Sequence, residues 1–179
     1  MQFNWPLIGH AHIRDYFARA FAAGNIHHAY LFEGPEHVGK AMFARMLAKT
    51  LLCGEPGNKP CHHCRGCVAF DRGIHPDVVE LKREEEAAAI SIEATREFIH
   101  SLATTALLGA VKIGMIEEAA LLNGEAAHVL LKTLEEPARG VVIFLVSHQP
   151  PLETIASRCQ RIRFGFTPTS EIASALASG

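Results

Sequence analysis

A glycine-rich segment between an apolar run and a helical pattern constrains the fold of this chain more than any other feature. Residues 34–41 read GPEHVGKA, which matches the phosphate-binding loop pattern as far as its lysine, Lys40. The apolar residues 28–32 come just before it and predict a buried strand, and a helical pattern starts near Gly39. In such a loop Gly34 and Gly39 let the backbone wrap a phosphate, while Lys40 supplies a positive charge. The segment therefore predicts a strand–loop–helix unit with a phosphate site at the end of the strand.

The rest of the chain alternates in the same way between short apolar runs and helical patterns. Besides 28–32, strands are predicted at 77–81, 111–116, 141–146 and 160–164, and helices at 11–23, 91–104 and 123–136. The run at 141–146 is apolar throughout, which suits the middle of a parallel sheet. We therefore predict an α/β fold with a five-stranded, mostly parallel sheet and helices on both faces.

The predicted strands and helices also divide the chain into two parts. Residues 1–166 hold all five predicted strands and are expected to form the nucleotide-fold domain. Thr167 resembles a helix cap and Pro168 the first residue of a helix, so residues 167–179 are expected to begin a second, helical domain that is truncated here.

Two positions of the predicted nucleotide site depart from what metal-dependent hydrolysis requires. The loop pattern ends in serine or threonine, whose hydroxyl binds Mg²⁺, but this chain has Ala41. A carboxylate must also follow an apolar strand, and Glu117 stands where aspartate is usual, followed by Glu118. Alternatively, both glutamates form a solvated pair at the start of a helix. We expect ATP and Mg²⁺ to bind weakly at most, and hydrolysis to fail.

Four of the five cysteines lie close together in the sequence and predict a structural zinc site at 53–67. Four thiolates fill the tetrahedral coordination of zinc and leave no open position for catalysis. Glycines and prolines between positions 54 and 60 disfavour a helix, so the metal would order this segment. His62 or His63 could replace one sulfur, and free thiols in a loop are the alternative. Cys159 is interpreted as a small buried side chain. The predicted ligands are Cys53, Cys61, Cys64 and Cys67.

The overall composition excludes several classes of protein. Hydrophobic residues make up 49% of the 179 residues, charged residues 20%, and the net charge is −2. This charge gives no field that would bind nucleic acid by itself. No apolar run reaches the length of a membrane helix, and the N-terminus lacks a signal-peptide pattern. We therefore expect a cytoplasmic protein with no membrane partner.

Several segments occur together in the order found in one known family. They are HAY at 28–30, the loop at 34–40, the four clustered cysteines, LLKTLEEP at 130–137 and SRC at 157–159. Together they resemble the subunits of the bacterial DNA polymerase III clamp loader, within the AAA+ ATPases, over about residues 5–166. That family has ATP-hydrolysing gamma and tau subunits and a delta-prime subunit that often lacks a working site. Because of Ala41 and Glu117, this chain is more similar to delta prime.

The resemblance implies a fold, site residues and partners. The implied fold is a RecA-like sheet domain followed by a helical lid and a collar. Arg158 would be offered to the ATP of a neighbouring subunit, and Ser147 falls where the family senses the terminal phosphate. The intact protein would sit in a hetero-pentamer with gamma or tau and delta, and help load the sliding clamp onto primed DNA. Without the family, Arg158 would be interpreted as an exposed salt-bridging residue and Ser147 as a strand-end hydroxyl bonded to the backbone.

Two further functions stay open at this point. The chain could be an active gamma-type ATPase in which water or another side chain replaces the missing hydroxyl of Ala41. It could also be a zinc-binding interaction module with a vestigial nucleotide fold. Zinc content does not separate these alternatives, because all of them predict zinc.

Overall fold

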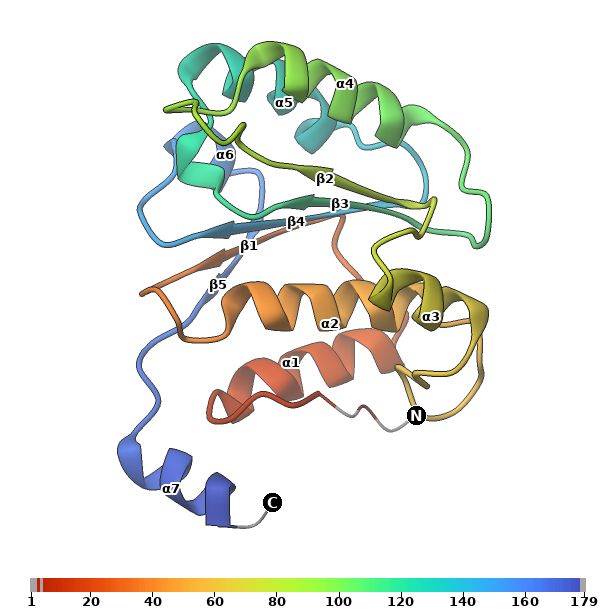
Figure 1. Ribbon diagram of the computed structural model, residues 1–179, viewed down its shortest axis with the longest axis vertical. Coiled ribbons are helices and arrows are strands. Elements are labelled where there is room, and N and C mark those ends of the chain that lie inside the picture. Colours follow the sequence, from red (N-terminus) through yellow and green to blue (C-terminus); the bar gives the residue numbers. More distant parts are fainter. Residues whose placement is uncertain (1–2, 4, 178–179) are drawn as a thin grey trace.

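Five parallel strands form the middle layer of the structure (Figure 1). The computed structural model describes residue 3 and residues 5–177. The order across the sheet is β2-β3-β4-β1-β5, so that β4 and β1 lie in the interior. All parallel strands end at the same edge, which brings the loops after β1, β3 and β4 together. The strands are β1 (Ala29–Glu33), β2 (Val78–Leu81), β3 (Lys112–Ile116), β4 (Val141–Ser147) and β5 (Gln160–Arg163).

Helices cover both faces of the sheet, as predicted (Figure 1). On one face lie α1 (Ala11–Ala22), α2 (Lys40–Leu52) and α3 (Arg65–Asp71). On the other lie α4 (Ile92–Ala103), α5 (Gly124–Glu135) and the short α6 (Glu153–Ala156), and a 3₁₀ turn spans Ala119–Leu121. The last helix, α7 (Thr169–Ala177), lies beyond the end of β5. None of the helices in the described part of the chain is long and apolar enough to cross a membrane.

Successive side chains of each strand point to opposite faces of the sheet, and they form two hydrophobic cores, one on each face. Tyr30 and Phe32 of β1 pack into the core beneath α1 and α2, while Leu31 packs into the core beneath α4 and α5. All seven residues of β4 are buried. Successive side chains of a strand point to opposite faces, so a strand covered on both sides must be apolar throughout.

Side-chain caps fix where two of the helices begin, as the sequence predicted. The Ser91 hydroxyl accepts a hydrogen bond from the amide of Ala94 at 3.2 Å, at the start of α4. The Asn123 side chain accepts from the amide of Ala126 at 2.8 Å, at the start of α5. Each cap satisfies a backbone donor that has no partner within the helix.

Three elements differ from the sequence prediction. The helix α3 was not predicted, because the glycines and prolines before it indicated a loop. Its first turn is capped by the side chain of Cys64, which accepts a hydrogen bond from the amide of Cys67. The four-residue helix α6 was also missed, since it is too short to show a helical period. Thr167 does not cap α7: its hydroxyl donates to the carbonyl of Ile8 at 3.4 Å, and the helix begins at Thr169, after Pro168. The domain division at residue 166 stays a prediction.

Candidate functional site

The structure brings most of the predicted nucleotide-site residues to one edge of the sheet. Glu33, the residue before the loop, pairs in register with Ser147 of the neighbouring β4. On the far side of β4, β3 ends at Ile116, and Glu117 follows it. The phosphate loop, Ser147 and Glu117 thus follow three adjacent strands, which is where open α/β sheets carry their ligands.

Both glycines of the loop are required by its backbone. Gly34 has φ 144°, and a Cβ atom there would lie 2.1 Å from the carbonyl oxygen of Phe164. Gly39 has φ 88° and occupies the N-cap position of α2. Side chains other than that of glycine rarely adopt such angles, and backbone cannot yield to a clash of this size. These two conformations are compatible with the predicted phosphate-binding loop, which leads into the N-terminus of α2.

Lys40 is folded back onto the loop that it belongs to. Its side chain is buried, and Nζ donates hydrogen bonds to the carbonyl of Gly34 at 2.8 Å and to that of Pro35. Burial lowers the pKa of its ammonium group, and the nearby Glu36 partly opposes this. A phosphate bound in the loop would have to replace these carbonyl contacts with its own oxygens.

Two acidic side chains near the loop, Glu33 and Glu117, are paired with arginines. Glu33 accepts from Arg161 at 2.9 Å and from Arg163 at 2.9 Å. Burial opposes the ionisation of Glu33, but the hydrogen bonds from both arginines outweigh it and lower the pKa of the carboxyl group. Glu117 contacts Arg45 of α2 at 3.2 Å.

Arg45 and a second arginine complete this set of ion pairs. Arg45 also contacts Glu80 at 2.6 Å, so that it joins the ends of β2 and β3. Glu118 lies 3.7 Å from Arg83. The two glutamates after β3 are therefore neither free metal ligands nor simply solvated charges, because each faces an arginine.

Ala41 and Ser147 offer little to a metal ion or a terminal phosphate in this arrangement. The methyl group of Ala41 packs against the core beside α2 and has no lone pair to give to Mg²⁺. Ser147 is buried, and its hydroxyl donates to the carbonyl of Gln149 at 2.5 Å. This is the backbone interaction that the sequence allowed as an alternative for Ser147.

Arg158 lies far from the phosphate loop of its own chain. Since Tyr30 pairs with Gln160 in register, Arg158 is level with the start of β1 rather than with its end. At about 3.3 Å per strand residue, the run from Tyr30 to Gly34 already spans roughly 13 Å, which exceeds the reach of an arginine side chain, and Arg158 precedes the residue that pairs with Tyr30. Its side chain is partly exposed and pairs with Glu135 at the end of α5, with Nη2 2.5 Å from Oε1.

The four clustered cysteines converge as the sequence predicted. Their Sγ atoms all lie within 4.8 Å of one another, and those of Cys61 and Cys67 are 3.9 Å apart. Sulfurs around a tetrahedral zinc ion lie about 3.8 Å apart, given Zn–S bonds of about 2.3 Å. Soft thiolates in this number and spacing fit zinc, and such a closed site is structural. Within the described residues this cluster contains only Cys53, Cys61, Cys64 and Cys67.

The environment of the cysteines favours an ionised sulfur at one position. Burial opposes ionisation of Cys64, but amide hydrogen bonds from Cys67 and Gly54 outweigh it and lower the pKa of this thiol to about 6. Burial raises the pKa of the Cys67 thiol to about 12 in the absence of metal. Outside the cluster, burial raises the pKa of Cys159 to about 12, as suits a packed, unreactive side chain.

The neighbouring histidines have other partners. Nδ1 of His62 lies 2.8 Å from Nζ of the buried Lys49, and Lys49 also contacts Asp71 at 2.7 Å. Nδ1 of His63 lies 2.8 Å from the carbonyl oxygen of Cys61. Neither ring completes the set of sulfurs, so the alternative in which a histidine replaces a cysteine is not supported.

Sequence reasoning missed the ion pairs at the carboxyl edge of the sheet. Glu33 is distant in sequence from both of its arginines, and Glu36 of the loop lies 3.4 Å from His148, which follows β4. A pattern of neighbouring residues in the sequence does not predict such contacts, because they depend on which strands lie side by side in the sheet. Alternation of arginines at positions 161 and 163 was the one available signal, since it places both on one face of a strand.

Comparison with known proteins gives a family for this arrangement. The family model described as "DNA polymerase III, delta subunit" matches residues 9–167. DNA polymerase III subunit delta′ of Escherichia coli is 39% identical over 79% of this chain and 43% of its own length. Subunit tau of the same organism is 36% identical over 86% of this chain and 24% of its own length. The chain thus spans less than half the length of these relatives.

A solved structure shows the same fold. A DNA polymerase III gamma subunit-related protein from Thermotoga maritima superposes with a TM-score of 0.60, at 23% identity, over 79% of this chain and 42% of that protein. The two identities above differ too little to separate delta′ from tau, whereas the family model that matches is a delta model. The chain therefore belongs to the family of DNA polymerase III clamp-loader subunits of the delta′ type.

Proposed function

We propose that this chain is the nucleotide-fold part of a delta′ subunit that does not hydrolyse ATP and instead supplies Arg158 to the ATP of a neighbouring subunit. The neighbours would be gamma or tau and delta subunits in a hetero-pentamer, which loads the sliding clamp onto primed DNA. The zinc site at 53–67 would be structural in this assembly. ATP and Mg²⁺ would bind weakly, if at all, to the chain's own loop.

The position of Arg158 is the observation that carries this proposal. It precedes the start of β5, and the strand from Tyr30 to Gly34 alone places it more than about 13 Å from the chain's own phosphate loop, so it has no part in a site within this chain. A guanidinium is always charged and spreads over several phosphate oxygens, which suits it to stabilise the charge of a transferring phosphoryl group. In the free chain Glu135 pairs with this side chain at the surface. In the assembly the phosphates of the neighbour's ATP would replace Glu135 as the anionic partner.

The lack of hydrolysis rests on Ala41 and on the ion pair of Glu117. Removal of the hydroxyl takes away one Mg²⁺ ligand, and Arg45 competes with a cation for the carboxylate of Glu117. A loop with these two features can hold phosphate but cannot orient metal and water for attack.

The decisive experiment measures DNA-stimulated ATP hydrolysis by the reconstituted clamp loader that carries Arg158→Ala in this subunit. We expect the rate to fall at least tenfold, since an arginine finger contributes about 10³ to 10⁵ in rate. Glu135→Gln is the matched control: it breaks the same ion pair but keeps the arginine, and it should leave the rate nearly unchanged. If both variants lowered the rate equally, the ion pair would matter and the finger would not.

An active gamma-type ATPase is the second candidate, favoured by the intact backbone of the loop and by the tau relative. Steady ATP hydrolysis by the purified chain with Mg²⁺ would establish it and would overturn the non-hydrolysing role.

A further inference from the structure

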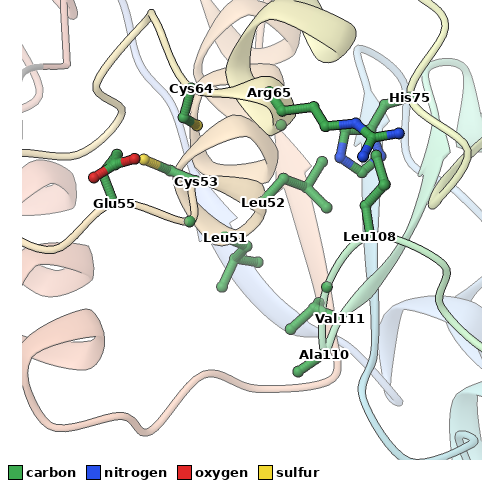
Figure 2. A pocket seen from close by; sticks show the side chains of 13 residues that line it. Leu51, Leu52, Cys53, Glu55, Cys64, Arg65, His75, Leu108, Ala110 and Val111 are labelled. Atoms are coloured by element: carbon green, nitrogen blue, oxygen red, sulfur yellow. The ribbon is translucent and has the colours of Figure 1, made fainter.

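A pocket of about 410 Å³ lies between the cysteine cluster and the loop before β3 (Figure 2). Its walls are the end of α2, residues 53–55, the first turn of α3, His75 and residues 108–111. The phosphate loop is at the other end of α2, about 18 Å away for a helix of this length. Neither the nucleotide site nor Arg158 takes part in this pocket.

Arg65 brings an unpaired positive charge to the pocket. It is the first residue of α3, directly after Cys64, and it is exposed. Figure 2 shows its side chain extending away from the cysteines, toward His75 and Leu108. Within the part of the chain that the structure describes, no carboxylate lies within ion-pair distance of this guanidinium. By contrast, carboxylates pair with the guanidinium groups of Arg45, Arg83, Arg158 and Arg161. A free guanidinium beside a pocket is a ready partner for a carboxylate.

His75 adds a hydrogen-bond donor that also lacks a partner. The residue is 5% exposed, and its Nδ1 accepts a hydrogen bond from the amide of Asp77 at 3.1 Å. In the neutral ring the proton is therefore on Nε2. Nε2 faces the first turn of α3, where a Cβ atom on Gly66 would lie 3.7 Å from it, and no described residue accepts from it. Nε2 is not one of the fully enclosed unpaired atoms of the described residues, so an acceptor that enters the pocket can reach it.

The opposite wall of the pocket is apolar and rigid. It is lined by Leu51, Leu52, Leu108 and Val111, and Leu107 beside it is 75% exposed. The loop that carries the two exposed leucines is fixed from below by Asp77. This fully buried carboxylate accepts from the amides of Leu107 at 2.6 Å and Leu108 at 2.8 Å. A surface held in place in this way loses little entropy when it binds.

We propose that this pocket docks an acidic, apolar segment of a partner protein. A carboxylate of the partner accepts hydrogen bonds from Arg65 and His75, and an adjacent apolar side chain contacts Leu52 and Leu108. A carboxylate can accept hydrogen bonds from both free donors. The leucines favour an apolar side chain in the partner one or two residues away from that carboxylate.

A nucleic acid fits the same pocket poorly. Glu55 lines it, as do the predicted zinc ligands Cys53 and Cys64, whose sulfurs are negatively charged when they bind zinc, so a chain of phosphates would meet negative charge there. The apolar wall also offers nothing to a phosphate backbone. A protein segment with single, spaced carboxylates avoids both difficulties.

The test is a titration of the zinc-loaded, ¹⁵N-labelled chain with an acetylated and amidated peptide that carries one aspartate flanked by leucines, followed by amide NMR shifts. We expect the amides of Gly54, Gly66 and Gly109, which line the pocket, to shift. A control peptide with asparagine in place of aspartate should bind about tenfold more weakly, because charge-assisted hydrogen bonds are lost. A thymidine oligonucleotide of similar length should leave these amides unshifted.

Two variants separate docking from a general charge effect. Arg65→Gln should weaken the acidic peptide about tenfold, since it removes the charged donor. Arg72→Gln, at the far end of α3 and outside the pocket, removes the same charge and should not change the affinity. Bound zinc per chain is measured for each variant.

Several results would overturn the proposal. One is equal binding of the aspartate and asparagine peptides, or no shift of the pocket amides with either. Another is an equal loss of affinity in Arg72→Gln. If Arg65→Gln lost zinc but kept the peptide, Arg65 would serve only to offset the thiolate charge. Oligonucleotide shifts at the same amides would assign the pocket to nucleic acid.

Discussion

Ala41 lies in the first turn of α2, where the family's magnesium-binding hydroxyl would be. Its methyl group already packs partly against the core, so a β-branched side chain must fit in a confined space. At this position a hydroxyl group would bind Mg²⁺, whereas a methyl group of similar size would not, because only the hydroxyl is a ligand.

At the residue scale, we therefore predict that Ala41→Thr strengthens the binding of ATP in the presence of Mg²⁺. The expected gain is about tenfold, which corresponds to about 1.4 kcal/mol. Isothermal titration calorimetry with and without Mg²⁺ measures it, and the gain should vanish when the metal is removed. No ATP turnover should appear, because Arg45 still occupies the carboxylate of Glu117.

Ala41→Val is the matched control for that substitution. Valine has nearly the same shape as threonine but carries no ligand atom, so it should bind ATP as weakly as the native chain. Equal affinities of the threonine and valine variants would show that the missing hydroxyl is not what limits binding.

At the element scale, helix α5 depends on a single side-chain cap. Asn123 is the only side chain in the described structure that satisfies a first-turn amide of this helix, and the bond to Ala126 is 2.8 Å long. Asn123→Ala should reduce the free energy of unfolding by about 1 kcal/mol. Urea denaturation measures the change. Asn123→Ser keeps an acceptor and should cost much less, and an equal cost for both would assign the effect to something other than the cap.

We predict that zinc bound by the four cysteines orders the segment around α3. This helix has seven residues, far fewer than the roughly 12 that an isolated helix needs in water. Removal of the metal by a chelator should therefore release the amides of residues 53–71 to rapid hydrogen exchange, while those of β1, β3 and β4 stay protected. Hydrogen exchange followed by mass spectrometry measures both.

Two observations would bear on that interpretation. Cys64→Ser should reproduce the effect of the chelator, whereas Cys159→Ser, outside the cluster, should leave zinc content unchanged. Slow exchange in α3 without metal would mean that burial of Phe70 and Cys67 orders this helix by itself.

At the scale of the whole molecule, stability depends on the aromatic core beneath α1 and α2. Phe144 in the middle strand β4 is 1% exposed, and its ring centroid is 5.9 Å from that of Tyr30 and 6.0 Å from that of Phe32. Phe144→Ala should lower the free energy of unfolding by about 3 to 5 kcal/mol, from lost burial and the cavity left behind. Urea denaturation monitored by circular dichroism provides the measurement.

Phe166→Ala is the control for that prediction. Phe166 is 80% exposed, so its loss should change the free energy of unfolding by less than about 0.5 kcal/mol. A comparable loss in both variants would indicate that the side chain of Phe166 is buried in solution.

Much of the fold was predictable because its signals are local. Apolar runs marked all five strands to within about two residues, and Ser91 and Asn123 marked two helix starts. The cysteine spacing predicted a cluster that the structure confirms. The helix α3 was not predicted, because Cys64 caps its first turn. The spacing of Cys64 predicted metal binding, and no sequence pattern indicated that it would also cap a helix.

Residue types and their near neighbours were enough to predict the class of fold, the glycines of the loop, the missing hydroxyl at Ala41 and the four sulfurs. The contacts of Lys40 with its own loop, the pairing of Glu117 with Arg45 and the separation of Arg158 from the phosphate loop became known only from the three-dimensional arrangement. The same holds for the pocket that Arg65 and His75 share. These facts follow from which strands and helices become neighbours, and that choice comes from packing across the whole sheet, which no local pattern records.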